Sequence, residues 1–103
     1  VSVTGTMPIT NGDNCKAPFP LVVSNHGTNV YEGFSQTSPK DGSVLNASAY
    51  YASQGYAVVL PDYLGYGAST LDYHPNLHAE NSAAVVIDAV RAARTWFSSL
   101  NGL

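Results

Sequence analysis

Two short apolar runs divide the chain, and each leads into a turn that contains glycine. The first is Leu21-Val22-Val23, which precedes His26-Gly27, and the second is residues 56–60, which precede a loop with Gly65 and Gly67. Continuous apolar runs of this length are typical of strands buried on both faces, as in parallel sheets. The pattern therefore predicts two buried strands, each followed by a loop at its carboxyl end.

A helical pattern lies between the two runs. Ser43 is a suitable N-cap residue, Leu45, Ala49 and Ala52 follow at helical spacing, and Gly55 suits the position just after a helix end. A strand, a helix and a second strand of these lengths favour a right-handed βαβ unit with parallel strands. The loose alternation of residues 2–10 is compatible with an early antiparallel strand. We therefore expect an α/β fold, with a mostly parallel sheet and flanking helices.

A second, longer helix is expected from about Leu77 onward. Its apolar residues recur at intervals of three and four, so they form one stripe that can face the sheet. Glu80 near its start and Arg91 and Arg94 towards its end suit the helix dipole. The stripe consists of Ala83, Val86, Val90, Ala93, Phe97 and Leu100.

Composition narrows the range of functions. The 103 residues fit one small domain, with 45% hydrophobic and 11% charged residues and a formal net charge of -3. Nucleic acid is an unsuitable partner, because phosphate binding needs clustered Lys and Arg and the four basic residues are scattered. No apolar run reaches the roughly 18 residues that a membrane-spanning helix needs. The low charge, with many Ser, Thr, Asn and Gly residues, favours a secreted or periplasmic location.

Two small features leave alternatives open. Cys15 is the single cysteine, and it either pairs with a cysteine outside this sequence or is a free thiol. Asn46-Ala47-Ser48 fits the N-glycosylation pattern, a triplet that also arises by chance. Neither feature decides the function.

Three segments, in this order and spacing, carry a resemblance to a known family. They are residues 23–28 (Val-Ser-Asn-His-Gly-Thr), residues 60–67 (Leu-Pro-Asp-Tyr-Leu-Gly-Tyr-Gly) and residues 74–83 (His-Pro-Asn-Leu-His-Ala-Glu-Asn-Ser-Ala). Over about residues 19–98 the chain resembles the amino-terminal half of α/β-hydrolases of the secretory lipase/esterase type. The resemblance implies a partial α/β-hydrolase fold, truncated before the nucleophile strand, in which residues 1–103 are the N-terminal portion of a single, incomplete domain. It also implies hydrolysis of carboxylic esters by a serine nucleophile, a histidine base and an acidic partner.

The resemblance assigns the turn after the first strand to an oxyanion hole. In α/β-hydrolases this loop supplies a backbone N–H that stabilises the oxyanion formed at the attacked carbonyl. We expect Thr28 to supply that donor, with Gly27 as the alternative, while His26 supports the loop by hydrogen bonds instead of acting as a base. The competing interpretation is an ordinary turn. Tyr63 and Tyr66 follow the second strand at the edge where open α/β sheets bind ligands, so they either contact substrate or pack on the surface.

The catalytic triad has no assignable member in this sequence. In this fold Ser, then Asp or Glu, then His would all come after its last residue. Ser69, in Gly67-Ala68-Ser69-Thr70-Leu71, lacks the closing glycine of a nucleophile elbow and is expected to be a turn residue. His74 and His78 are expected to be structural, because no third metal ligand accompanies them, and Asp62 is expected to accept hydrogen bonds from nearby backbone amides. No metal or cofactor is expected.

The leading hypothesis is a fragment of a serine esterase or lipase that contributes the oxyanion loop but not the triad; whether this chain alone is an enzyme stays open. The alternative is a non-catalytic binding or assembly module with a hydrolase-like frame. A nucleotide-binding domain is disfavoured, because no helix start follows Gly65-Tyr66-Gly67 and position 70 is not glycine.

The expected partners are a small-molecule or lipid ester and the remaining half of the domain, on a second chain if it is not on this one. The resemblance places the nucleophile strand beside Leu21–Val23. Without it that strand is an open apolar edge, and such edges pair with other chains. The isolated chain is therefore expected to be poorly soluble or partly molten.

Overall fold

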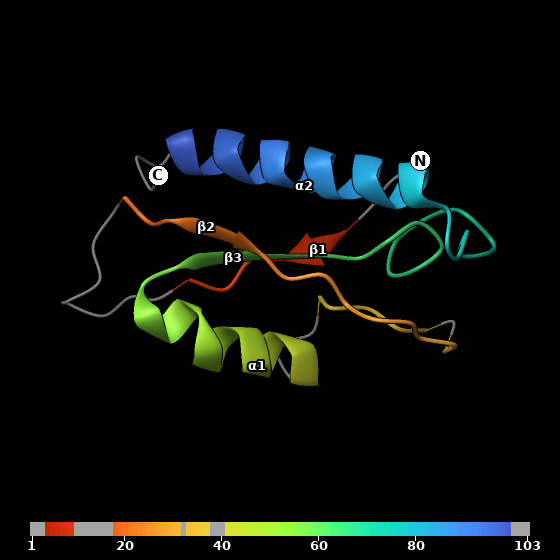
Figure 1. Ribbon diagram of the computed structural model, residues 1–103, viewed down its shortest axis with the longest axis horizontal. Coiled ribbons are helices and arrows are strands. Elements are labelled where there is room, and N and C mark those ends of the chain that lie inside the picture. The colour runs from red at the N-terminus through yellow and green to blue at the C-terminus, as the bar shows by residue number, and fades with distance from the viewer. Residues whose placement is uncertain (1–3, 10–17, 32, 38–40, 100–103) are drawn as a thin grey trace.

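A small mixed sheet lies between two helices (Figure 1). The computed structural model describes residues 4–9, 18–31, 33–37 and 41–99, and Cys15 and Leu100 lie outside these ranges. α1 and α2 cover opposite faces of the sheet (Figure 1). In chain order the elements are β1 (Gly5–Thr6), β2 (Leu21–Val23), α1 (Gly42–Tyr50), a 3-10 turn (Ala52–Gln54), β3 (Ala57–Pro61) and α2 (Ala79–Ser99).

The strands lie in the order β1-β3-β2. β2 runs parallel to β3, with Val22 opposite Val58, which confirms the predicted βαβ unit. β1 pairs antiparallel with β3 on the other side, with Gly5 opposite Pro61, so the early antiparallel strand is also present. The pairing at Gly5 is close, since a Cβ there would lie 2.6 Å from the carbonyl oxygen of Leu60.

The core is built around β3, in which every residue is buried. Because side chains alternate along a strand, Val58 and Leu60 face one helix while Val59 and Pro61 face the other. The α1 side holds one apolar cluster of Val44, Ala47, Ala52, Val58 and Leu60. On the opposite side the buried residues of α2 are Val85, Ala93 and Phe97.

β2 differs from its prediction in one respect. Its apolar run indicated burial on both faces, whereas all three residues are only half-buried. The reason is its position at the edge of the described sheet, where one side of the strand has no neighbour. Val22 still packs against the α1 cluster.

The ends of α1 correct the predicted cap. The N-cap is Asp41 instead of Ser43, because its carboxylate accepts a hydrogen bond from the backbone N–H of Ser43 at 2.8 Å. Ser43 itself therefore lies inside the helix. At the other end a 3-10 turn follows α1, and Gly55 closes it in the left-handed conformation with φ 90°, as its glycine predicts.

α2 starts at Ala79, two residues later than the pattern indicated. Leu77 has a left-handed backbone with φ 59°, which does not continue into a right-handed helix. The predicted stripe, widened by Val85, Ala89, Ala92 and Trp96, does face the sheet at Val85, Ala93 and Phe97, whereas its first member, Ala83, is exposed. Within the described ranges, neither helix combines the length and apolar character that crossing a bilayer requires.

Candidate functional site

The loops that follow β2 and β3 lie together at one edge of the sheet. Because the two strands are parallel, their carboxyl ends meet at the same edge, and both chain segments leave the sheet in the same direction (Figure 1). The ladder continues just past β2, where the N–H of Ser24 donates to the carbonyl of Val59 at 2.8 Å. Further along, the N–H of Gly67 donates to the carbonyl of Phe34 at 3.2 Å. The β3 loop thus supports the β2 loop from the side.

Asp62 is the main polar link between these loops. It directly follows β3 and is fully buried. Its Oδ2 accepts hydrogen bonds from the hydroxyls of Thr4 and Ser35, and its Oδ1 accepts one from the backbone N–H of Gln36, all at 2.8 Å. A buried carboxylate needs such donors to replace water. Asp62 therefore joins the residue before β1, the β2 loop and the β3 loop.

This network refines the expectation for Asp62. It does bind a backbone amide, but that amide is 26 residues away in sequence, and two hydroxyls complete its shell. The turn above it is restricted to glycine: Gly67 has φ 58°, and a Cβ there would collide with Asp62 Oδ2 and with Thr4 Oγ1.

Five rings form a cluster beside this network. The imidazole of His26 packs against Phe34, Tyr63 and Tyr66, with ring centroids 4.7, 4.4 and 5.4 Å away. His74 joins from the β3 loop, 4.5 Å from Tyr66 and stacked at 5.9 Å on Tyr63. Aromatic pairs at such separations are favourable beyond the area they bury. The ring cluster fixes the orientation of His26.

The two tyrosines also reach the backbone of the β2 loop. The hydroxyl of Tyr66 donates to the carbonyl of Asn29, and that of Tyr63 lies 3.4 Å from the carbonyl of His26. Burial raises the pKa of Tyr63 above its ordinary value of 10.0. Tyr66 is buried and Tyr63 half-buried, so both form part of the wall behind the turn. Their contact with a substrate stays a prediction.

The turn itself, His26-Gly27-Thr28, is the exposed part of the site. Gly27 and Thr28 are exposed, and a Cβ on Gly27 would meet no atom within 4 Å. His26 Nδ1 lies 2.7 Å from the carbonyl oxygen of Gly27. Since a carbonyl can only accept, Nδ1 donates. The turn is thus open on one side and braced on the other, while the oxyanion role of Thr28 or Gly27 stays a prediction.

Ser69, His74 and His78, which were expected to be structural, each form hydrogen bonds with nearby backbone groups. Ser69 Oγ accepts hydrogen bonds from the N–H groups of Gly65 and Leu71, at 3.1 and 3.3 Å, so this hydroxyl shapes a turn. His74 Nδ1 lies 2.7 Å from the carbonyl of Leu64. His78 Nδ1 accepts from the N–H of Asn81 at 3.3 Å, at the start of α2. In the described part of the chain, His, Cys, Asp and Glu side chains form no group of three that could hold a metal.

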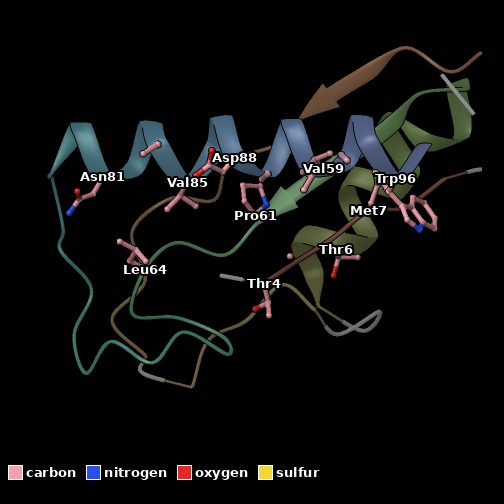
Figure 2. A pocket seen from close by; sticks show the side chains of 15 residues that line it. Thr4, Thr6, Met7, Val59, Pro61, Leu64, Asn81, Val85, Asp88 and Trp96 are labelled. Atoms are coloured by element: carbon pink, nitrogen blue, oxygen red, sulfur yellow. The ribbon is translucent and has the colours of Figure 1, made fainter. Parts of the chain in front are cut away.

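Two hollows lie on different sides of the molecule. The larger, of about 640 Å³, is a groove between α2 and the β1–β3 side of the sheet, lined by apolar residues such as Val85 and Trp96, with Asp88 at its side (Figure 2). The smaller, of about 330 Å³, lies between the Ser24–Gly27 turn and α1. Only the smaller hollow reaches the turn that the sequence singled out.

Sequence reasoning missed several residues of this site. Ser35, Gln36 and Asn29 hold the β2 loop in place, yet they lie in a stretch without periodicity or a motif. The one available signal was Asp62, a carboxylate placed directly after a buried strand, which requires donors from elsewhere in the chain.

Comparisons with known proteins place the fold in context. A scan against family models found no match, and a search of curated proteins found none. Among solved structures, the small sheet with its two helices matches part of the α/β fold of an esterase.

That esterase is LipA from Xanthomonas oryzae, described as a rice cell wall degrading esterase. One of its structures is 39% identical in sequence, with a TM-score of 0.81, over 93% of this chain and 25% of LipA. A single-residue mutant is 38% identical, with a TM-score of 0.84, over 95% of this chain and 26% of that protein. A ligand-bound form is 36% identical, with a TM-score of 0.81. The chain thus spans about a quarter of the LipA structures it matches, and the match supports an esterase-like hydrolase origin.

Proposed function

We propose that this chain supplies the oxyanion loop of a serine carboxylic ester hydrolase of the lipase or esterase type, whose triad comes from residues outside these 103. The observation that carries the proposal is the match to LipA, with 36–39% identity over nearly all of this chain. Because a fold alone does not establish a function, the proposal also rests on the geometry of the site.

The geometry of the turn supports the role. An oxyanion donor must be held in place before the reaction, so that no reorganisation is needed when charge develops. The ring cluster around His26 and the hydrogen bonds of Asp62 hold the β2 loop, while Gly27 and Thr28 stay exposed. A backbone N–H of Thr28, or of Gly27, is the donor we assign.

The residues that contact the substrate can be proposed from their position next to the turn. Tyr63 and Tyr66 back the turn, so we assign them to the wall of the site that receives a small-molecule or lipid ester. Since LipA is described as degrading a cell wall, an ester of a wall polymer is a further candidate substrate. Such a substrate lies outside the cell that makes the enzyme, so it would require a secreted protein.

A chimera of LipA tests the proposal. Residues 1–103 replace the matching quarter of LipA, and hydrolysis of p-nitrophenyl butyrate is measured for the chimera and for the chain alone. We expect turnover by the chimera and none by the chain. Turnover by the pure chain would contradict a triad outside it, and Ser69 would then be the first residue to substitute. A folded but inactive chimera would favour a non-catalytic module.

Proline substitutions locate the donor within an active chimera. Thr28→Pro removes the N–H, and loss of one oxyanion donor costs about 100-fold to 1,000-fold in kcat. Thr28→Ala keeps the N–H and should keep kcat. If Thr28→Pro retains activity, Gly27→Pro tests the alternative donor. Full activity of both proline variants, with unchanged melting temperature, would show that this turn is not the oxyanion loop.

A further inference from the structure

The smaller hollow, next to the exposed turn, has the chemistry of a binding site. Its walls come from the Ser24–Gly27 turn, from Gln36 and from one face of α1. At about 330 Å³ it lies in the size range of small-molecule sites. A water molecule occupies about 30 Å³ in the liquid, so the hollow is far larger than one bridging water requires.

The lining is polar but uncharged. Ser24, Asn25, Ser43 and Asn46 line the hollow, and no described residue of its wall is Asp, Glu, Lys or Arg. A charged ligand taken from water into such a site would find no opposite charge among the described lining residues to offset its desolvation. Neutral ligands that both donate and accept hydrogen bonds suit these side chains.

Two acceptors on lining residues lack a partner. Gln36 is 1% exposed, and its Oε1 is buried without a hydrogen bond among the described residues. The same holds for His26 Nε2, which is the acceptor of the neutral ring because Nδ1 donates to Gly27. Buried acceptors without donors are unfavourable. Both atoms are closed off from the solvent that fills the hollow, so a ligand bound there relies on the exposed asparagine side chains of the wall instead.

Two tyrosines complete the site. Tyr50, the last residue of α1, and Tyr51, which caps it, line the hollow and are 72% and 42% exposed. Their rings offer flat apolar faces beside a polar cavity, a combination suited to a ligand with one apolar and one hydroxyl-bearing side.

From these observations we propose that the hollow between the Ser24–Gly27 turn and α1 binds a neutral, polyhydroxylated group, such as a sugar ring or a polyol. The ring or carbon backbone packs against Tyr50 and Tyr51, and hydroxyls reach the asparagine and serine side chains of the wall. The site is a binding site in its own right and stands whether or not the chain takes part in ester hydrolysis.

Saturation-transfer NMR tests the proposal on the chain and, in parallel, on the LipA chimera. The probes are methyl β-glucoside, glycerol and glucuronate, which separate a sugar ring, a short polyol and a charged sugar of the same shape. We expect saturable binding of methyl β-glucoside in the millimolar range and weaker binding of glucuronate. Glycerol binding as tight as the glucoside would assign the site to polyols in general. Absence of saturable transfer from both neutral probes, or tighter binding of glucuronate, would overturn the proposal.

Surface variants show whether binding occurs in this hollow. Tyr50→Ala should weaken glucoside binding by about three- to tenfold, the size of one aromatic contact, and Tyr50→Phe should restore it. Tyr73→Ala is the matched control, since Tyr73 is 65% exposed and lies outside the hollow. Asn46→Ala removes an exposed polar side chain of the wall and should weaken binding further, with folding checked by circular dichroism. Unchanged affinity of Tyr50→Ala, or an equal loss in Tyr73→Ala, would contradict this location.

Discussion

β2 and the centre of β3 contain the same residue types yet occupy different environments. Leu21-Val22-Val23 and Val58-Val59-Leu60 each consist of two valines and one leucine. β3 is buried throughout because it has a strand on each side and a helix on each face, whereas β2 is half-buried at the edge. Composition therefore identifies a strand, while its neighbours decide how much that strand contributes to stability.

The loops that follow the two strands also differ in burial: the residue after β3 is buried and the turn after β2 is exposed. Asp62, just after β3, is fully buried and binds three donors, while Asn25, two residues after β2, is exposed. Asp62→Ala should lower the free energy of unfolding by about 3 kcal/mol or more, since three donors lose a charged acceptor. Asn25→Ala should stay within about 0.5 kcal/mol of the unsubstituted chain. Urea unfolding at low protein concentration measures both, in the LipA chimera as well as in the isolated chain, because a partly molten chain would not unfold cooperatively.

An intermediate variant sharpens this test. Asp62→Asn keeps one acceptor oxygen, so its loss of stability should fall between those of Asp62→Ala and Asn25→Ala. Equal stability of Asp62→Ala and Asn25→Ala would mean that the buried network contributes nothing, and the contrast between the two loops would disappear.

The next contrast lies within the strands, at two residues that face each other across the ladder. Val22 and Val58 are partners in register and both contact the α1 cluster. Val58→Ala should cost about 2 kcal/mol, because Val58 is fully buried, and Val22→Ala about 1 kcal/mol. The same unfolding measurement serves. A larger loss at Val22 would show that β2 is not the more weakly held strand.

The smallest effect on stability is expected at the outer side of β2. Pro20 and Ser24 bond to β3, so by alternation Val22 also faces β3, while the N–H of Val23 points to the open edge. Val23→Pro should slow aggregation of the chain, measured by light scattering, and change stability by about 1 kcal/mol or less. Val22→Pro, which removes a ladder bond, should cost about 3 kcal/mol.

The proposed hydrolase domain allows a second test of the open edge of β2. If another strand pairs with β2 in the LipA chimera, Val23→Pro should destabilise the chimera while leaving the isolated chain nearly as stable. Aggregation of Val23→Pro at the unsubstituted rate would mean that association of the chain does not proceed through β2.

Local patterns in the sequence were sufficient for most of the frame. The two strands, their parallel pairing, the early antiparallel strand and both helices follow from periodicity and turn residues. The cap was misassigned because Asp41 and Ser43 are both good N-cap residues, and only the backbone decides between them. Leu77 could not be foreseen in a left-handed conformation, since leucine rarely adopts it.

The site was predictable only in part. The His26-Gly27-Thr28 turn and Asp62 stand directly after apolar runs, so the sequence marks them. Their partners at Ser35 and Gln36 belong to a loop with no local signal, and contacts across 26 residues depend on the path of the chain. Half-burial of β2 likewise depends on a neighbouring strand, which its own residues do not encode.

The bond between Thr4 and Asp62 has a consequence for the order of assembly. It spans 58 residues, and β1 and β2 both pair with β3 and not with each other. During synthesis the amino-terminal segments therefore emerge from the ribosome with no strand to pair with until residues 57–61 have followed. Contacts of such long range slow folding. β3 is thus the strand on which the earlier part of the chain folds. The nascent chain is most prone to aggregation just before β3 has been synthesised, because its earlier strands are still unpaired.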